Sequence, residues 1–310
     1  MKYGFGVDVG GTSIKIGYFN IDGNMLEKWS IDTDISDNGS HILPGIAQSI
    51  DAFIEKKKID KKNIIGIGLG VPGPVTNDGI INKCINLGWG VFNVEETLAS
   101  LTGFRVKAGN DANVAALGEM WRGSGTGYEN VVMVTLGTGI GGGVIIGGKV
   151  VHGAHGAGGE IGHIPIRHKE GRTCGCGKIN CIEAYASGSA IAKTGIIRVT
   201  EYAGDTSLRG ISNITAKEIF EHAENGDTLA CDIVEEIGEL LGEALASVAC
   251  VSDPDIFIIG GGVSHAGQPL IDVVQKYYKK SVFHASAQAK FAIAVLGSDA
   301  GKYGAARLLL

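Results

Sequence analysis

Two glycine-rich segments of the sequence could bind phosphate groups. The first contains Asp8, Gly10, Gly11, Thr12 and Lys15, and the second reads Gly-Thr-Gly-Ile-Gly-Gly-Gly at 137–143. Backbone N–H groups in such turns bind phosphate oxygens, and a carboxylate such as Asp8 can hold the metal ion of a metal–nucleotide complex. Either turn alone could be a purely structural hairpin, but two that face each other would clamp a polyphosphate.

A third glycine run follows an apolar segment, 255–259, that has the composition of a buried strand. In open α/β sheets, ligands bind beyond the carboxyl ends of the strands. Glycines there would let adenine or ribose approach the backbone, although a tight turn with nothing bound fits this run equally well. Together the three runs predict a nucleotide site. Its candidate residues are Asp8, Gly10, Gly11, Thr12, Lys15, Thr138, Gly139, Gly260, Gly261 and Gly262.

Asn110 and Asp111 stand where a helical segment, 112–121, is expected to begin. A carboxylate at the start of a helix often serves only as an N-cap, and the pair alone favours that interpretation. The alternative is a general base, because kinases use an aspartate to accept the proton of the substrate hydroxyl. Beside two phosphate-binding segments, Asp111 becomes the candidate for this base.

A fourth cluster consists of His163, Cys174, Cys176 and Cys181. Three thiolates and one imidazole form the complete ligand set of a closed, tetrahedral structural zinc site, so the spacing predicts bound Zn²⁺. Three unrelated buried cysteines are the alternative, which the polar, loop-like surroundings disfavour. Glu160 and Glu183 flank the cluster, and their carboxylates could accept hydrogen bonds from sugar hydroxyls.

The composition is that of a globular protein of the cytoplasm. The chain has 310 residues and a net charge of -6, which argues against nucleic acid as a partner. Its first residues lack the basic flank and apolar run of a signal peptide. Seven glycines interrupt the longest apolar stretch, 131–148, so it should form two strands and no membrane helix. We therefore expect a cytoplasmic protein without disulfides or membrane contact.

The elements that must position these residues alternate between strands and helices, which indicates an α/β fold. Helices are expected at 44–58, 94–102, 112–121, 183–193, 216–223 and 229–251, with a last one from about residue 300. The strand–loop–strand pattern of residues 5–19 returns at 131–146, with Val7–Gly10 aligned on 134–137 without gaps. This repeat predicts two related lobes, although any two glycine-rich hairpins look alike.

Together these motifs resemble the ROK family (repressors, open reading frames, kinases), and within it the bacterial glucokinases. The resemblance covers nearly the whole chain. It rests on Asp8-Val-Gly-Gly-Thr with Lys15, Val71-Pro-Gly73, Asn110-Asp111, the glycine run from Gly137, Glu160-Ile-Gly-His163, and the segment from Cys174 through Cys181 to Glu183. The last two motifs, in this order, are highly specific.

The resemblance implies an actin/hexokinase-like fold with two α/β lobes flanking a cleft. The small lobe would comprise residues 1–109 and 298–310, and the large lobe 110–297. The large lobe would include the zinc loop, which is the segment that carries His163, Cys174, Cys176 and Cys181. It also implies ATP and Mg²⁺ as cofactors, structural Zn²⁺, and a homo-oligomer, either a dimer or a tetramer. Sugar contacts would fall on Gly73, Asn86, Asn110, Asp111, Glu160, His163 and Glu183, and zinc on His163, Cys174, Cys176 and Cys181.

The activity implied is ATP-dependent phosphorylation of glucose at its 6-hydroxyl, a reaction of carbohydrate metabolism and glycolysis, with Asp111 as the base. Asn86-Leu-Gly-Trp89 favours glucose, but the pocket size near the sugar 2-position cannot be read from sequence. A kinase for N-acetylmannosamine, fructose or allose is therefore the nearest alternative. An actin-like ATPase switch would not need sugar-binding residues beside a zinc site, and the phosphate hairpins disfavour a zinc-dependent binding module.

Two points separate this chain from parts of the family. Asn180 stands where the family usually has glycine before the third cysteine, and because asparagine tolerates a left-handed backbone the zinc loop should survive. Family members that are repressors carry an added N-terminal DNA-binding domain. A first hairpin that begins at residue 3 leaves no room for one, which favours the kinases.

Overall fold

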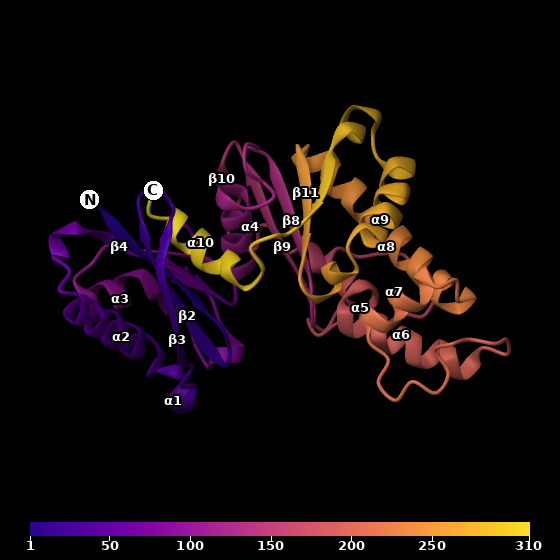
Figure 1. Ribbon diagram of the computed structural model, residues 1–310, viewed down its shortest axis with the longest axis horizontal. Helices are drawn as coiled ribbons and strands as arrows, with labels where there is room; N and C mark the ends of the chain where they lie inside the picture. The colour runs from indigo at the N-terminus through magenta and orange to yellow at the C-terminus, as the bar shows by residue number, and fades with distance from the viewer.

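The computed structural model describes residues 1–310, which form two halves, each built on one five-stranded sheet (Figure 1). The first sheet has the order β3 (Met25–Asp32), β2 (Ser13–Asn20), β1 (Tyr3–Val9), β4 (Ile64–Val71) and β7 (Val106–Asn110). β1, β2 and β3 pair antiparallel, whereas β4 and β7 continue the sheet in parallel from β1. The α/β fold class is therefore confirmed.

The second sheet repeats this plan. Its order is β10 (Lys149–Val150), β9 (Ile140–Ile146), β8 (Val131–Leu136), β11 (Ile256–Gly260) and β12 (Lys290–Ile293), again with three antiparallel strands and then two parallel ones. Asp8 and Thr135 occupy equivalent positions, since each lies between an antiparallel and a parallel neighbour near the end of its strand. The internal repeat is confirmed.

One face of the first sheet is apolar and the other is rich in glycine. Phe5, Val7 and Val9 of β1 belong to a core that also contains residues of α2 (Ile42–Lys57) and α3 (Val94–Thr102). On the opposite face, α10 (Ala300–Arg307) lies directly against β1 and β4. A Cβ atom added at Gly68 of β4 would lie 1.7 Å from the carbonyl oxygen of Ala305, so only glycine allows this approach.

Helices cover both faces of the second sheet. One face carries α4 (Asp111–Arg122), which packs against β8 and β9 and also against α10. The other face is covered by the main core of this half, which includes residues of α5 (Glu183–Ala186), α6 (Gly188–Glu201), α7 (Ala216–Glu224), α8 (Thr228–Ser252) and α9 (Gln268–Ser281). α4 and α10 thus lie between the two sheets (Figure 1). A further one-turn segment, α1 (Ser36–Gly39), precedes α2.

The expected helices are confirmed to within two residues, with one exception, and two further helices, α1 and α9, were not predicted. The helix expected over 183–193 is wrong, because Ser187 has an extended backbone and its side chain accepts a hydrogen bond from the N–H of Ala190. That cap ends α5 and begins α6. None of the helices is both long and apolar enough to cross a bilayer.

Candidate active site

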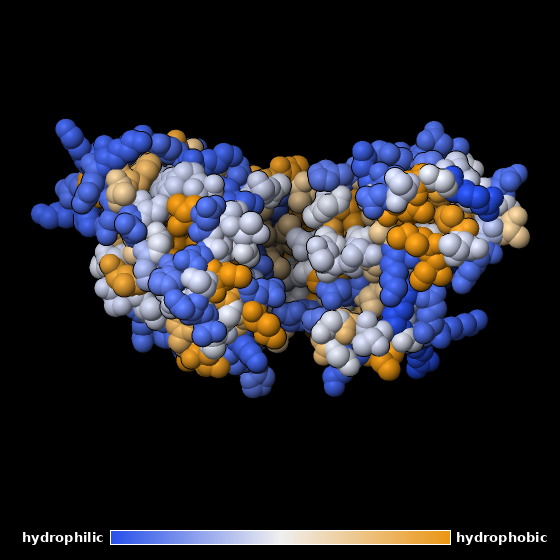
Figure 2. Space-filling view, turned by 90° about the horizontal axis from the view of Figure 1, so that it is seen from below, coloured by the Kyte–Doolittle hydropathy of each residue, from blue (hydrophilic) through white to orange (hydrophobic).

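A cavity of about 1040 Å³ lies between the two halves, and residues from both sheets line it. Figure 2 shows the molecule hollowed between its halves. Sites for small molecules commonly measure about 300–1,000 Å³, so this cavity has room for a nucleotide and a second ligand. The sequence-derived candidates that line it are Asp8, Lys15, Asn86, Asp111, Thr138, Gly139, Glu160, His163, Glu183, Gly260 and Gly261.

Asp8 and Lys15 face each other across the first hairpin, where β1 pairs with β2. Burial raises the pKa of Asp8 above its ordinary value, and the positive charges of Lys15 and Lys302 oppose that shift. Gly301, in the first turn of α10, packs against the carboxylate, since a Cβ there would lie 2.6 Å from Cγ of Asp8. The first strand and the last helix together therefore fix this carboxylate.

Gly10, Gly11 and Thr12 form the turn that follows Asp8, and they do not line the cavity. The N–H of Gly10 donates to the carbonyl oxygen of Ser13 at 3.1 Å, and its carbonyl accepts from the hydroxyl of Thr33 at 2.7 Å. Gly11 and Thr12 are exposed at the tip of the hairpin. The N–H of Gly10 is therefore already used within the turn.

Glu183 links the second glycine run to the cysteine cluster. Its Oε2 accepts a hydrogen bond from the N–H of Ile140 at 2.8 Å, and Gly139 leaves room for this contact because a Cβ there would lie 2.3 Å from Oε2. Its Oε1 lies 3.4 Å from Sγ of Cys174. Glu183 therefore holds the hairpin and the loop together while its carboxylate lines the cavity.

The N-cap of α4 is Asn110. Its side-chain oxygen accepts hydrogen bonds from the N–H groups of Ala112 at 3.0 Å and Asn113 at 3.2 Å, and its amide donates to the carbonyl of Gly73. The interpretation of Asp111 as the cap is therefore wrong. Asp111 is the first helical residue and lines the cavity.

The pKa of Asp111 is raised to about 6, chiefly by burial. The negative charges of Asp8 and Glu160 contribute to this rise, whereas hydrogen bonds from the N–H of Ala112 and the side chain of Asn110 oppose it. A carboxylate with such a pKa is still mostly ionised at neutral pH, and it is more basic than an ordinary aspartate. Asp111 could therefore act as a general base.

Glu160 and His163 come from a short 3₁₀ turn, Ile161–His163, and its cap. The Nε2 atom of His163 lies 3.8 Å from Oε2 of Glu160, and both side chains are partly exposed to the cavity. The other ring nitrogen, Nδ1, lies 3.7 Å from Sγ of Cys174. The two nitrogens of His163 thus face different groups, one in the cavity and one in the cysteine cluster.

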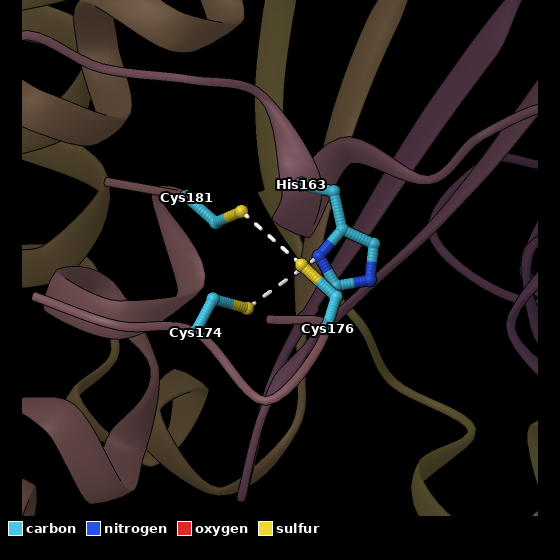
Figure 3. Close-up of side chains that lie close together, drawn as sticks. All are labelled: His163, Cys174, Cys176 and Cys181. Atoms are coloured by element: carbon cyan, nitrogen blue, oxygen red, sulfur yellow. Dashed lines mark hydrogen bonds between the residues drawn. The ribbon is translucent and has the colours of Figure 1, made fainter. Parts of the chain in front are cut away.

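The cysteine cluster converges on a single point (Figure 3). The ligand atoms of His163, Cys174, Cys176 and Cys181 all lie within 4.8 Å of one another. The sulfur atoms of Cys176 and Cys181 are 3.6 Å apart, close to the edge of about 3.8 Å that tetrahedral zinc–sulfur bonds require. The set therefore fits a tetrahedral metal ion, and every cysteine of the chain is a free thiol.

Some candidates lie beside the cavity and do not line it. These are Gly10, Gly11, Thr12, Gly73, Asn110 and Gly262. Other lining residues were not among the candidates, and they include Thr135, Ser264, His265, Ser298 and Gly301. Thr135 could have been found, because the repeat aligns it with Asp8. Ser298 and Gly301 carry no motif, and only the return of the chain to the first sheet brings them here.

Comparisons with known proteins agree with this geometry. The model of the ROK family matches residues 4–310. A glucokinase from Halalkalibacterium halodurans is 40% identical over 306 residues, covering 96% of this chain and 92% of the relative. A ROK hexokinase from Thermus thermophilus superposes with a TM-score of 0.80 at 30% identity, covering 99% and 97% of the two chains. A ROK glucokinase from Streptomyces griseus, solved with glucose and AMPPNP, gives 0.74 at 33% identity, covering 99% and 98%.

Proposed function

The chain belongs to the ROK family, and we propose that it is a glucokinase, which transfers the γ-phosphoryl group of ATP to the 6-hydroxyl of glucose. One observation carries the proposal. Asp111, with its raised pKa, lines the same cavity as two glycine-rich hairpins and a set of sugar-binding candidates, Glu160, His163 and Glu183. The similarity to glucokinases along nearly the whole chain supports it.

The nucleotide would occupy the part of the cavity between the two hairpins. Lys15 and the backbone N–H groups around Thr138 and Gly139 would bind phosphate oxygens. Asp8 would hold Mg²⁺, which when bound neutralises charge on the transferring phosphoryl group. Gly260 and Gly261 line the cavity beside the apolar side chains of Met133, Ile293 and Ala294, which suit adenine. The turn from Gly10 to Thr12 and Gly262 would act by shaping the ends of this site.

Glucose would lie against the residues that surround Asp111. The carboxylates of Glu160 and Glu183 would accept hydrogen bonds from sugar hydroxyls, and Asn86 lines the same region. Asn110 and Gly73 are joined by a hydrogen bond of 3.2 Å and lie beside the cavity. They would support the sugar site from outside the cavity. This arrangement would fix the 6-hydroxyl next to Asp111.

Asp111 would accept the proton of the 6-hydroxyl as that oxygen attacks the γ-phosphorus in line with the leaving ADP. A base with a pKa of about 6 is ionised at neutral pH and retains driving force for the proton transfer. Closure of the cavity around the bound sugar would keep bulk water from the attacking position, which favours transfer to the sugar over hydrolysis of ATP.

Zn²⁺ would be held by His163, Cys174, Cys176 and Cys181, which fit it in number, type and spacing. Four protein ligands leave no open position, so the metal would be purely structural. Binding through Nδ1 would leave the proton of His163 on Nε2, where it can donate to a sugar hydroxyl. The sugar would then take the place of the carboxylate or carbonyl to which a metal-bound histidine usually donates its other ring N–H.

A coupled assay of ADP release across hexoses and amino sugars tests the function. Glucose should give the highest kcat/KM, and turnover of ATP without sugar should be far slower than with it. If N-acetylmannosamine, fructose or allose outperforms glucose, the chain is a kinase for that sugar. An ATPase rate that does not depend on sugar would instead support a mechanical ATPase switch and contradict the kinase proposal.

A further inference from the structure

The backbone of Asn180 lies at a junction of the zinc loop, directly before the ligand Cys181. Its N–H donates to the carbonyl of Arg172 at 2.9 Å, and its carbonyl accepts from the N–H of Ile166 at 2.8 Å. Its φ angle is +63°, in the left-handed region that glycine enters at no steric cost. Glycine would adopt this backbone conformation at least as easily. The backbone therefore does not explain why asparagine stands at this position.

The side chain of Asn180 makes two further hydrogen bonds. Its Nδ2 donates to the carbonyl of His168 at 3.1 Å, and its Oδ1 accepts from the phenolic hydroxyl of Tyr185 at 2.6 Å. His168 belongs to the first arm of the loop, whereas Tyr185 belongs to α5, two residues after Glu183. The amide therefore ties two arms of the loop to the helix that carries Glu183.

Tyr185 is only 3% exposed and is held on several sides. Its hydroxyl also accepts a hydrogen bond from the N–H of Arg172 at 2.8 Å. The guanidinium of Arg172 lies 4.7 Å from the ring centroid, and the ring of His168 packs 4.3 Å from it. A buried phenol with a donor and an acceptor for its hydroxyl is well satisfied, so it holds one position.

The same residues reach the helices behind the loop. Arg172 donates from Nη1 to the hydroxyl of Thr194 in α6 at 2.8 Å, and Nε2 of His168 lies 3.2 Å from Oε1 of Glu236 in α8. None of these contacts involves the metal-binding atoms of the cysteine cluster. The loop is thus attached to the protein by a second set of bonds, separate from those that a metal would supply.

We propose that Asn180 and Tyr185 are positioning residues whose hydrogen bond braces the zinc loop independently of the metal. This brace slows the release of Zn²⁺ and keeps Glu183 in place when the metal is lost. The inference rests on the proposed kinase function and on the metal site, and it adds the residues that decide how strongly sugar binding depends on zinc.

Two variants remove the bond from opposite ends. Asn180→Gly keeps the left-handed backbone and loses both side-chain bonds, whereas Tyr185→Phe keeps the ring and loses the hydroxyl. Lys178→Ala, at an exposed position of the same loop, is the matched control. Zinc transfer from the loaded protein to a chromogenic chelator should be about fivefold to tenfold faster in each variant, as expected for one or two neutral hydrogen bonds. The control should release zinc at the wild-type rate.

The double variant tests whether the two residues act through one bond. Adding Tyr185→Phe to Asn180→Gly should accelerate zinc release less than Tyr185→Phe does in the wild type, because the shared bond is already gone. Fully additive effects would mean that the residues act separately, and a wild-type rate in both single variants would overturn the proposal. Tyr185→Phe remains informative if Asn180→Gly folds poorly.

Glucose kinetics before and after zinc removal provide the second readout. Loss of zinc should raise the KM for glucose about tenfold more in Asn180→Gly than in the wild type, with kcat changed little. A role in global stability alone would lower Tm and leave this difference at zero, which contradicts the brace. If the wild type phosphorylates no hexose, the proposed function fails while zinc release still tests the brace. If the purified protein holds no zinc, the metal assignment fails. A higher glucose KM in Asn180→Gly than in the wild type would then still support the brace, and equal KM values would overturn it.

Discussion

Asp111 combines a buried position with two carboxylate neighbours, and this allows a direct test of its role. Asp111→Asn keeps the size and polarity of the side chain and removes the base. We expect kcat to fall about 10²–10⁴-fold, whereas glucose affinity, measured by calorimetry, should change little because other residues bind the sugar. A kcat close to that of the wild type would mean that Asp111 is not the base.

The pH dependence of the reaction should follow from the same carboxylate. The pKa of Asp111 is raised to about 6, and the base works only when ionised. kcat/KM for glucose should therefore be level at neutral pH and fall about tenfold per pH unit below 6. Glu160→Gln removes a charge that raises this pKa, so it should move the acid limb to lower pH. A limb near pH 4 in the wild type would contradict the assignment.

At this scale, the sequence identified residues that line one cavity but not the hydrogen bonds that they make. It identified Asp111 and Asn110 together, but it could not tell which of them caps the helix, because both are good N-caps. It also placed Gly10 among the phosphate-binding groups, although the N–H of Gly10 is used by Ser13 within the turn. Such distinctions depend on hydrogen bonds that only the folded backbone determines.

The contact between α10 and the first sheet predicts a strong effect of one methyl group. Gly68→Ala would place a Cβ 1.7 Å from the carbonyl oxygen of Ala305, so α10 must shift away from β4. We expect a loss of about 1–3 kcal/mol in the free energy of unfolding. Because Gly301 moves with α10, the KM for ATP should also rise through displacement of Asp8.

Gly45→Ala is the matched control for this substitution. Gly45 lies in α2, and the nearest atom to an added Cβ is 3.9 Å away. Alanine in a helix interior should stabilise the protein by about 0.5–1 kcal/mol. Urea unfolding of both variants measures the difference, and two shifts of the same sign would refute the packing argument.

The zinc loop should respond to the loss of a single ligand. Cys176→Ala leaves three ligands, so we expect the protein to lose its metal and the KM for glucose to rise, with the KM for ATP much less affected. Metal analysis of the wild type should find about one zinc ion per chain. An unchanged glucose KM in Cys176→Ala would show that the loop does not need the metal to form the sugar site.

Among the elements, the sequence predicted those whose patterns are local. The bounds of α3, α4 and α8 were predicted to within one residue, because helical patterns depend on residues that are close in the sequence. The break at Ser187 was missed because Ser187 lies within an otherwise helical stretch, and its capping role depends on the backbone there being extended. α9 was not predicted because its N-cap is Gly267, which offers no side chain to cap the helix, so the usual N-cap signal is absent from the sequence.

For the whole molecule, we propose that the halves close on their substrates. The cavity between them is open to solvent in the hollow of Figure 2, and exclusion of water would favour phosphoryl transfer over hydrolysis. Glucose with a non-hydrolysable ATP analogue should reduce the radius of gyration measured by small-angle X-ray scattering. Asp111→Asn should close equally well, since its base is not needed for binding, and an unchanged radius in the wild type would contradict closure.

The sequence predicted the arrangement of the two sheets, whereas the boundaries between the lobes remain proposals. The repeat predicted two related sheets, and both have the same strand order and directions. A division of the lobes at 109/110 and 297/298 remains our proposal, because α4 and α10 pack against each other across it. Assembly into a dimer or tetramer is likewise a prediction, which light scattering would test.

The shared plan of the two sheets also bears on the direction in which a nucleotide would bind. Two equivalent hairpins around one cavity make an approximate twofold axis, and a strictly symmetric cavity would accept an asymmetric ligand in two opposite orientations. At the equivalent strand positions, however, one half presents the carboxylate of Asp8 and the other the neutral hydroxyl of Thr135. The duplicated scaffold thus forms the walls of the cavity, and this difference between the two halves would favour one orientation of a bound metal–nucleotide over the opposite one.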